Sequence, residues 1–162
     1  MTSGASTEYS VFTKPWPDKS LAELGRFVHG LGFDAVELPV RPGFQVEPAA
    51  IAGGLPEAAR LLREEGVRIA SIAGPTDEAA LAACAAAGVP IVRVCVHIPP
   101  DEGYMAAEAR LQREYDALLP LLDKHGVTLG IQNHCDHFVA NAMGIRHLIE
   151  KYPAPRVAAV WD

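Results

Sequence analysis

Four segments of the chain combine a helix-like pattern, a glycine and an apolar, β-branched run, always in that order. The glycines are Gly32, Gly66, Gly88 and Gly126. A glycine at a helix end adopts the left-handed conformation that reverses the backbone, so that a strand can follow at once. Repeated helix–glycine–strand units are typical of parallel α/β folds, in which active sites gather at the carboxyl ends of the strands. The sequence therefore predicts a parallel α/β domain with its functional residues at one edge of the sheet.

The apolar pattern along the whole chain predicts six strands and five helices. The strands are expected at 9–13, 35–38, 67–72, 91–97, 128–132 and 157–161. The helices are expected at about 21–31, 49–65, 77–87, 104–124 and 140–151. The second has an alternative start at Pro56, since proline is favourable in a first turn, and Thr76 is the expected N-cap of the third. Residues 1–8 are predicted to be a flexible tail, and residues 9–162 to form one domain.

The composition excludes several classes of function. The chain of 162 residues carries a net charge of −6 and no cluster of Lys and Arg, which disfavours binding to nucleic acid. No apolar run is long enough to span a membrane, and the first residues lack the features of a signal peptide. Three scattered cysteines, Cys84, Cys95 and Cys135, favour reduced thiols over disulfides. We expect a soluble, cytoplasmic protein that acts on a small molecule.

Two architectures fit alternating strands and helices: an open doubly wound sheet and a barrel of eight βα units. The segment Lys14-Pro-Trp-Pro17 follows the first strand in place of a glycine-rich phosphate loop, which disfavours the doubly wound sheet. Only six strands are predicted, and the last ends next to Asp162. We therefore expect an incomplete, α/β (β/α)8 TIM-barrel-like fold, truncated after the sixth strand, whose open sheet edges could pair with a second copy.

Three segments of the chain resemble the sugar phosphate isomerase/epimerase family, which has a xylose-isomerase-like TIM barrel and includes the endonuclease IV branch. They are Leu31-Gly-Phe-Asp-Ala-Val-Glu-Leu-Pro-Val40, Gly126-Val-Thr-Leu-Gly-Ile-Gln-Asn-His134 and Val157-Ala-Ala-Val-Trp-Asp162. The resemblance covers nearly the whole chain, in order, but only the earlier part of such a barrel. It implies a metal-dependent isomerase or epimerase that acts on a sugar or sugar phosphate through an enediolate.

The resemblance also implies a divalent cation (Mn²⁺, Mg²⁺, Co²⁺ or Zn²⁺) held at the ends of the later strands of the barrel. In this chain the strand-five position is Gln132 and the strand-six position is Asp162, and the remaining two ligands have no counterpart. Gln132 departs from the glutamate of the family. Its amide oxygen can bind a hard cation, but it carries no charge and cannot act as a base. Metal binding is therefore expected of an intact parent protein, and this chain alone could lack it.

Further side chains are predicted to line the same pocket. His97 is a candidate hydrogen-bond donor or proton shuttle, with anchoring of a loop as the alternative. Glu37 is expected to contact substrate or to pair with Arg41. Trp16 could stack on a sugar ring or pack beneath the first loop. The strand-end positions and the resemblance together imply catalysis by Gln132 and His97 and substrate binding by Glu37, Trp16, Arg41 and His134. Metal binding by Asp162 and Gln132 is implied by the resemblance alone.

Two hypotheses compete with the isomerase or epimerase. An endonuclease IV-like phosphodiesterase needs several zinc-binding histidines and a basic groove, and the negative charge of the chain disfavours it. The segment His134-Cys-Asp-His137 resembles a zinc motif, but structural zinc usually takes ligands from two separated pairs. The other hypothesis is a non-catalytic open barrel fragment or a pseudoenzyme.

Overall fold

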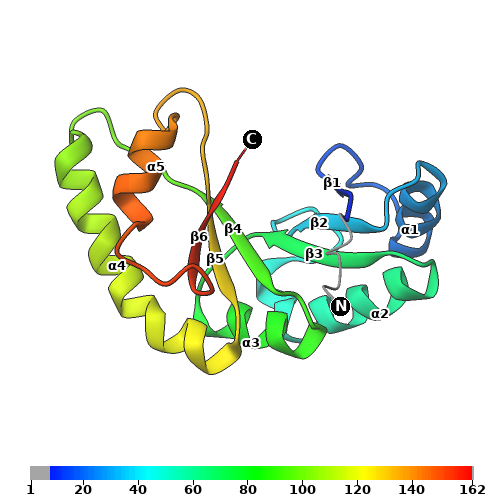
Figure 1. Cartoon of the computed structure of the whole chain (residues 1–162). Coiled ribbons are helices and arrows are strands. Elements are labelled where there is room, and N and C mark those ends of the chain that lie inside the picture. Colours follow the sequence, from blue (N-terminus) through cyan, green and yellow to red (C-terminus); the bar gives the residue numbers. More distant parts are fainter. Residues whose placement is uncertain (1–7, 162) are drawn as a thin grey trace, which may run out of the picture.

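The structure, a computed structural model, describes residues 8–161 (Figure 1). Within that range six parallel strands form one sheet: β1 (Ser10–Phe12), β2 (Ala35–Pro39), β3 (Arg68–Ala73), β4 (Ile91–Cys95), β5 (Thr128–Gln132) and β6 (Val157–Val160). The α-helices are α1 (Leu21–Gly30), α2 (Ile51–Glu64), α3 (Glu78–Ala87), α4 (Tyr104–His125) and α5 (Ala142–Ile149). The tail predicted for residues 1–8 lies, except for Glu8, outside the described residues.

The order of the strands in the sheet distinguishes the two expected architectures. The strands lie side by side in their chain order, from β1 to β6, and every neighbouring pair is parallel. A doubly wound sheet would reverse its strand order at a switch point, whereas a barrel does not. The sheet is curved, and the helices lie along its outer side (Figure 1). The predicted fold class, an incomplete (β/α)8 barrel, is therefore confirmed.

The glycines that end the helices have the predicted conformation. Gly88 and Gly126 are the C-caps of α3 and α4, with φ of 72° and 66° in the left-handed region. The residue after each of these glycines makes a backbone hydrogen bond to the last turn of the helix. The amide of Val89 donates to the carbonyl of Cys84 at 2.9 Å, and the amide of Val127 donates to the carbonyl of Leu122 at 3.1 Å. These bonds satisfy carbonyls of the last turn and direct the chain into β4 and β5.

Most element boundaries differ from the predictions by one or two residues, and three of the differences have a visible cause. Asp77, not Thr76, caps α3, because its carboxylate accepts from the amide of Ala80 at 2.9 Å. Pro56 lies inside α2, since a 3-10 turn at Pro48–Ala50 starts the helical segment earlier. Strand β4 ends at Cys95, so His97 follows the strand and forms an antiparallel bridge with Phe138.

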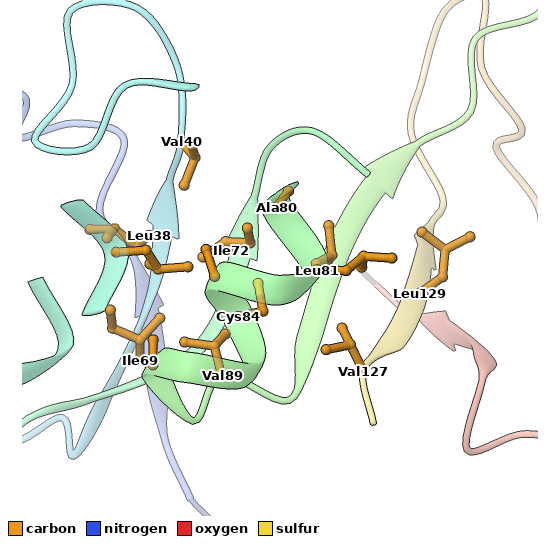
Figure 2. Close-up of a cluster of buried hydrophobic side chains, with 14 of the residues drawn as sticks. Leu38, Val40, Ile69, Ile72, Ala80, Leu81, Cys84, Val89, Val127 and Leu129 are labelled. Carbon is orange, nitrogen blue, oxygen red and sulfur yellow. The ribbon is translucent and has the colours of Figure 1, made fainter. Parts of the chain in front are cut away.

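The apolar core lies between the outer face of the sheet and the helices. Figure 2 shows Leu81 and Cys84 of α3 among apolar side chains of the sheet and its loops. These are Ile72 of β3, Leu129 of β5, and Val89, which follows α3. Cys84 is completely buried, and this burial raises the pKa of its thiol to about 12. The three cysteines are free thiols, as predicted.

No helix between residues 8 and 161 combines the length and the apolar character that a bilayer crossing needs. The cytoplasmic location and the lack of a nucleic-acid partner stay predictions.

Candidate functional site

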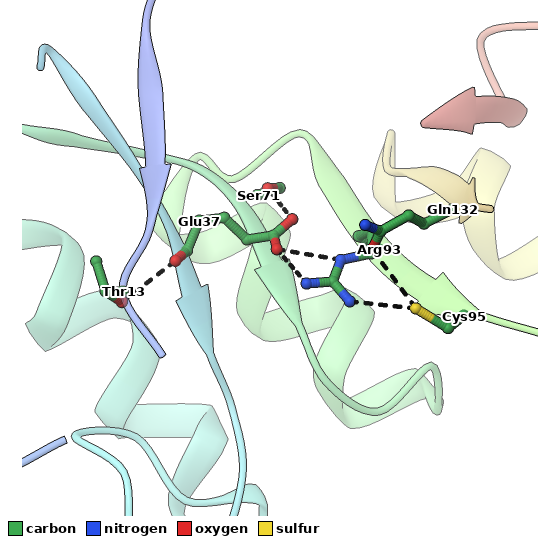
Figure 3. A network of polar contacts seen from close by, with 6 residues as sticks. All are labelled: Thr13, Glu37, Ser71, Arg93, Cys95 and Gln132. Carbon is green, nitrogen blue, oxygen red and sulfur yellow. Dashed lines mark hydrogen bonds and ion pairs between the residues drawn. The ribbon is translucent and has the colours of Figure 1, made fainter. Parts of the chain in front are cut away.

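The inner face of the sheet carries polar side chains at the middle of the barrel. Residues alternate between the two faces of a strand, and Val36, Leu38 and Val92 belong to the core on the outer face. The residues between and beside them therefore face inward. Barrel interiors are usually filled by bulky apolar side chains. Here the inward positions instead hold Glu37, Ser71, Arg93, Cys95 and Gln132 (Figure 3).

A buried ion pair joins β2 to β4. Arg93 pairs through Nη2 with Oε1 of Glu37, and its Nε donates to the same oxygen at 3.1 Å. Ser71 on β3 donates its hydroxyl to the other carboxylate oxygen at 2.9 Å. The side chains of Arg93 and Glu37 are only 7% and 15% exposed. Burial alone would lower the pKa of the Arg93 guanidinium, but the hydrogen bonds and charge of Glu37 outweigh it and raise that pKa.

The same arginine is connected to Gln132 on β5 through a thiol. Arg93 Nη1 donates to Sγ of Cys95 at 3.5 Å, and that thiol donates to Oε1 of Gln132 at 3.5 Å. Gln132 is 9% exposed. Figure 3 shows this chain of contacts running across the sheet from Glu37 to Gln132. The network therefore fixes the orientation of both the guanidinium and the amide.

The ring of Phe12 of β1 lies near the guanidinium groups of two arginines. The guanidinium carbon of Arg93 is 4.8 Å from the centre of the Phe12 ring, and that of Arg41 is 6.0 Å from it. Cations over an aromatic face are held by the quadrupole of the ring. The predicted pair of Glu37 with Arg41 is wrong, because the partner of Glu37 is Arg93 on β4, whereas Arg41 lies in the loop after β2.

Two cavities lie on either side of this network. The larger, of about 690 Å³, opens at the carboxyl ends of the strands, and its lining includes Lys14, Arg41 and His134. The smaller, of about 400 Å³, is lined by Glu37, Ser71 and residues nearer the strand starts. Phe12, Arg93 and Gln132 line both. These three side chains therefore form the floor of the larger cavity, which we call the main cavity.

The structure brings most of the predicted site residues together. Gln132, Arg41 and His134 all line the main cavity. Glu37 lies below its floor and reaches it through Arg93. Their contribution to binding and catalysis stays a prediction, but their convergence is a property of the structure.

Other predicted residues lie elsewhere. His97 is exposed and packs edge-on against Phe138, with ring centres 5.3 Å apart, and it lines a separate cavity beside α4. This position favours loop anchoring. Trp16 packs edge-on against Phe27 of α1 at 4.9 Å and lines neither cavity at the floor, which favours its packing role. Asp162 lies outside the described residues.

The described side chains do not fit a divalent cation. Within residues 8–161 there is no group of three or more His, Cys, Asp or Glu side chains that could hold a metal. Gln132 supplies one neutral oxygen, and that oxygen already accepts from Cys95. The predicted metal site at Gln132 and Asp162 therefore stays a prediction.

Arg93 is the main site residue that the sequence analysis missed. It is the one charged residue in the run Ile91-Val-Arg-Val-Cys95. A charge between two outward-facing valines must point into the barrel and needs a partner there. Cys95 also faces inward by this alternation, and its thiol links Arg93 to Gln132.

Gly130 of β5 leaves room for two side chains below the floor. A Cβ at this position would lie 2.7 Å from Cγ2 of Val160 and 3.2 Å from Cγ2 of Ile91. We expect Gly130→Ala to lower the free energy of unfolding by about 1–3 kcal/mol, because both branched neighbours must shift. Urea denaturation measures this. Gly53→Ala in α2, where an added Cβ meets nothing within 4 Å, is the matched control and should be neutral or stabilising. Equal stabilities of the two variants would contradict the prediction.

Comparison with known proteins identifies the fold. The family model described as xylose isomerase-like TIM barrel matches residues 26–162. A 3-keto-D-glucoside 4-epimerase from E. coli is 13% identical, with a TM-score of 0.74 over 97% of this chain and 68% of that chain. A D-psicose 3-epimerase from Clostridium cellulolyticum H10 is 10% identical, with a TM-score of 0.77 over 96% of this chain and 63% of that chain.

A xylose isomerase domain protein from Alicyclobacillus acidocaldarius is 17% identical, with a TM-score of 0.69, and the match covers 96% of this chain and 63% of that one. No curated protein matches the sequence. Identities this low show a shared fold. The chain spans 63% to 68% of the length of these three structures.

Proposed function

This chain belongs to the xylose isomerase-like TIM barrel family, and from that premise we propose that it acts in the isomerisation or epimerisation of a sugar. The observation that carries the proposal is the main cavity, at the carboxyl ends of parallel strands, with Arg93 and Gln132 in its floor. Active sites of TIM barrels lie at this end. The names of two solved structures of the same fold, an epimerase of a 3-keto-D-glucoside and one of D-psicose, support a sugar as substrate.

Isomerisation and epimerisation both move a proton at the carbon beside a carbonyl. Removing that proton puts negative charge on the carbonyl oxygen. Hydrogen-bond donors that are already oriented toward this oxygen lower the energy of the transition state of the reaction most effectively. Arg93 and Gln132 are suited to this task, because the network from Glu37 to Cys95 holds both in place. The raised pKa of Arg93 keeps its guanidinium charged throughout.

A base must take the proton and return it. His134 lines the main cavity, and an imidazole can exchange protons near neutral pH. One base serves an isomerisation in which the proton leaves and returns on the same face of the intermediate. An epimerisation needs a second group on the opposite face. The proposed transfer uses His134 as base and Arg93 and Gln132 as donors to the substrate oxygens.

Solvent exchange tests the proposal without knowledge of the particular sugar. The chain is incubated with a panel of ketoses and aldoses in deuterium oxide, with and without Mn²⁺, and NMR follows deuterium at the carbon beside the carbonyl. We expect enzyme-dependent incorporation for at least one sugar, and its loss in His134→Ala. A panel that shows no exchange under either condition would contradict the proposal.

The non-catalytic alternative has its own structural support. Strands β1 and β6 are the edges of the described sheet, and unpaired edges invite association with a second copy. Sedimentation velocity on the samples used for exchange separates the two hypotheses. A chain that associates with itself and exchanges no deuterium would support the non-catalytic fragment.

A further inference from the structure

We propose that the main cavity contains an anion subsite formed by Lys14 and Arg41, so that the sugar it accepts carries a phosphate or carboxylate group. The identity of the ligand as a sugar rests on the proposed function. The anion subsite itself rests on the charges and contacts of this chain alone.

The walls of the main cavity are cationic. Lys14, Arg41 and Arg93 line it, and none of the described residues in its lining is acidic. Glu37 lies below the floor, where its charge is matched by Arg93. The chain as a whole carries a net charge of −6, so this local excess of positive charge runs against its overall balance. Such a pocket attracts anions and disfavours cations.

The two cations at the rim have no carboxylate partner in the part of the chain that the structure describes. Several arginines elsewhere have one: Arg60 binds Glu57 and Glu64, and Arg110 binds two glutamates as well. The acids nearest to Arg41 in the sequence are engaged by other groups. Glu37 accepts from Arg93, and Glu47 accepts from the amide of Gly43 at 3.1 Å. Neither of these two carboxylates therefore pairs with Arg41.

Both cations are attached to ordered backbone at the same end of neighbouring strands. Lys14 directly follows Thr13, whose amide and hydroxyl both donate to the carbonyl of Glu37, at 3.1 and 3.2 Å. Arg41 is half-buried above the Phe12 ring, and its carbonyl accepts from the amide of Phe44 at 3.2 Å. A planar guanidinium and an ammonium group that line the same cavity are favourable partners for a phosphate or carboxylate.

This arrangement also orients the substrate. Lys14 and Arg41 follow β1 and β2, whereas Gln132 and His134 lie at the end of β5, three strands away from β2 in the sheet. An anionic group held at the β1–β2 side directs the other end of the sugar toward Gln132 and His134. The subsite would thus place the reacting carbon as well as add affinity.

The test compares ligands that differ only in their anionic group. Isothermal titration at constant ionic strength measures binding of D-fructose, its 6-phosphate, the corresponding uronate D-fructuronate, and inorganic phosphate. We expect at least one of the two anionic sugars to bind about tenfold or more tightly than D-fructose, because charge-assisted hydrogen bonds to Lys14 and Arg41 add to the contacts of the neutral sugar. The stronger of the two identifies phosphate or carboxylate as the preferred group.

Variants assign that preference to residues. The double variant Lys14→Gln/Arg41→Gln should lose both the preference for the anionic sugar and the binding of inorganic phosphate. A lysine in place of glutamine at position 41 (Lys14→Gln/Arg41→Lys) should restore part of the preference and part of the phosphate binding. Arg113→Gln, which removes the same charge from an exposed position on α4, is the control and should keep the preference. Equal binding of all three sugars, binding of none of the four ligands, or a preference that survives in the double variant would overturn the subsite.

The exchange assay keeps this proposal separate from the proposed function. Phosphate binding that depends on Lys14 and Arg41, without deuterium exchange on any sugar, would contradict the isomerase or epimerase and support the anion subsite. Deuterium exchange on neutral sugars, without tighter binding of anionic ones, would support the isomerase or epimerase and contradict the anion subsite.

Discussion

Replacing Arg93 by methionine will lower the free energy of unfolding by about 3 kcal/mol, the lower end of the range for breaking a buried ion pair. The substitution keeps a long side chain in the floor but leaves Glu37 without its cation, in a position where only 15% of its side chain is exposed. Ser71 still donates one hydrogen bond to that carboxylate. Water in the smaller cavity, which Glu37 lines, can solvate it in part, which is why we expect the lower end of the range.

A double-mutant cycle shows how much of this loss comes from the unpaired charge. Glu37→Gln together with Arg93→Met removes both charges, and we expect the double variant to be more stable than the sum of the two single losses predicts. Arg146→Met is the matched control, because Arg146 pairs with Glu150 on the surface of α5, with both side chains at least half exposed. It should cost no more than about 1 kcal/mol. Urea denaturation at pH 7 measures all four variants. If Arg93→Met and Arg146→Met lose the same stability, the buried pair has no special role.

The fold could be predicted from the sequence because its signals are local. Glycine after a helix fixes a backbone reversal within a few residues, and β5 at Thr128–Gln132 has the predicted bounds. Boundaries failed where two neighbours offer the same chemistry. Thr76 and Asp77 can both cap a helix, and only the distance to the amide of Ala80 decides between them.

The site could be predicted only in part, because its contacts join distant strands. Glu37 was expected to line the same pocket as Gln132, but it lies below the floor of the main cavity and its partner comes from a distant part of the chain. Arg41 is close to Glu37 in the sequence, whereas Arg93, 56 residues away, is its partner in the structure. Strand alternation could have placed Arg93 inside the barrel. It could not have shown that Cys95 connects Arg93 with Gln132, since that contact depends on the positions of two side chains on neighbouring strands.

The second large effect is expected in catalysis. Gln132→Leu should reduce the rate constant kcat for deuterium exchange by about 100-fold, the loss typical of removing one donor to a developing oxyanion. The loss should fall on kcat more than on KM, because the charge on the substrate oxygen develops in the transition state. Gln112→Leu on α4 makes the same chemical change at a side chain that donates to the carbonyl of His147, away from the cavity, and should leave the rate unaltered. Equal rates in the two variants would show that the floor does not contact the reacting oxygen.

Gln132→Glu then tests the prediction of a metal independently of activity. A carboxylate is a better ligand than an amide for a hard divalent cation, because it adds charge to the same geometry. The variant should therefore bind Mn²⁺ more tightly than the native chain, as measured by calorimetry or by the electron paramagnetic resonance of free Mn²⁺. In the native chain Arg93 and Cys95 already occupy the neighbourhood of the Gln132 oxygen, so a cation there would compete with the Cys95 hydrogen bond and be repelled by the guanidinium. Unchanged Mn²⁺ affinity in Gln132→Glu, together with exchange that needs no Mn²⁺, would mean that Arg93 provides the positive charge at this floor and would contradict the metal assignment of Gln132.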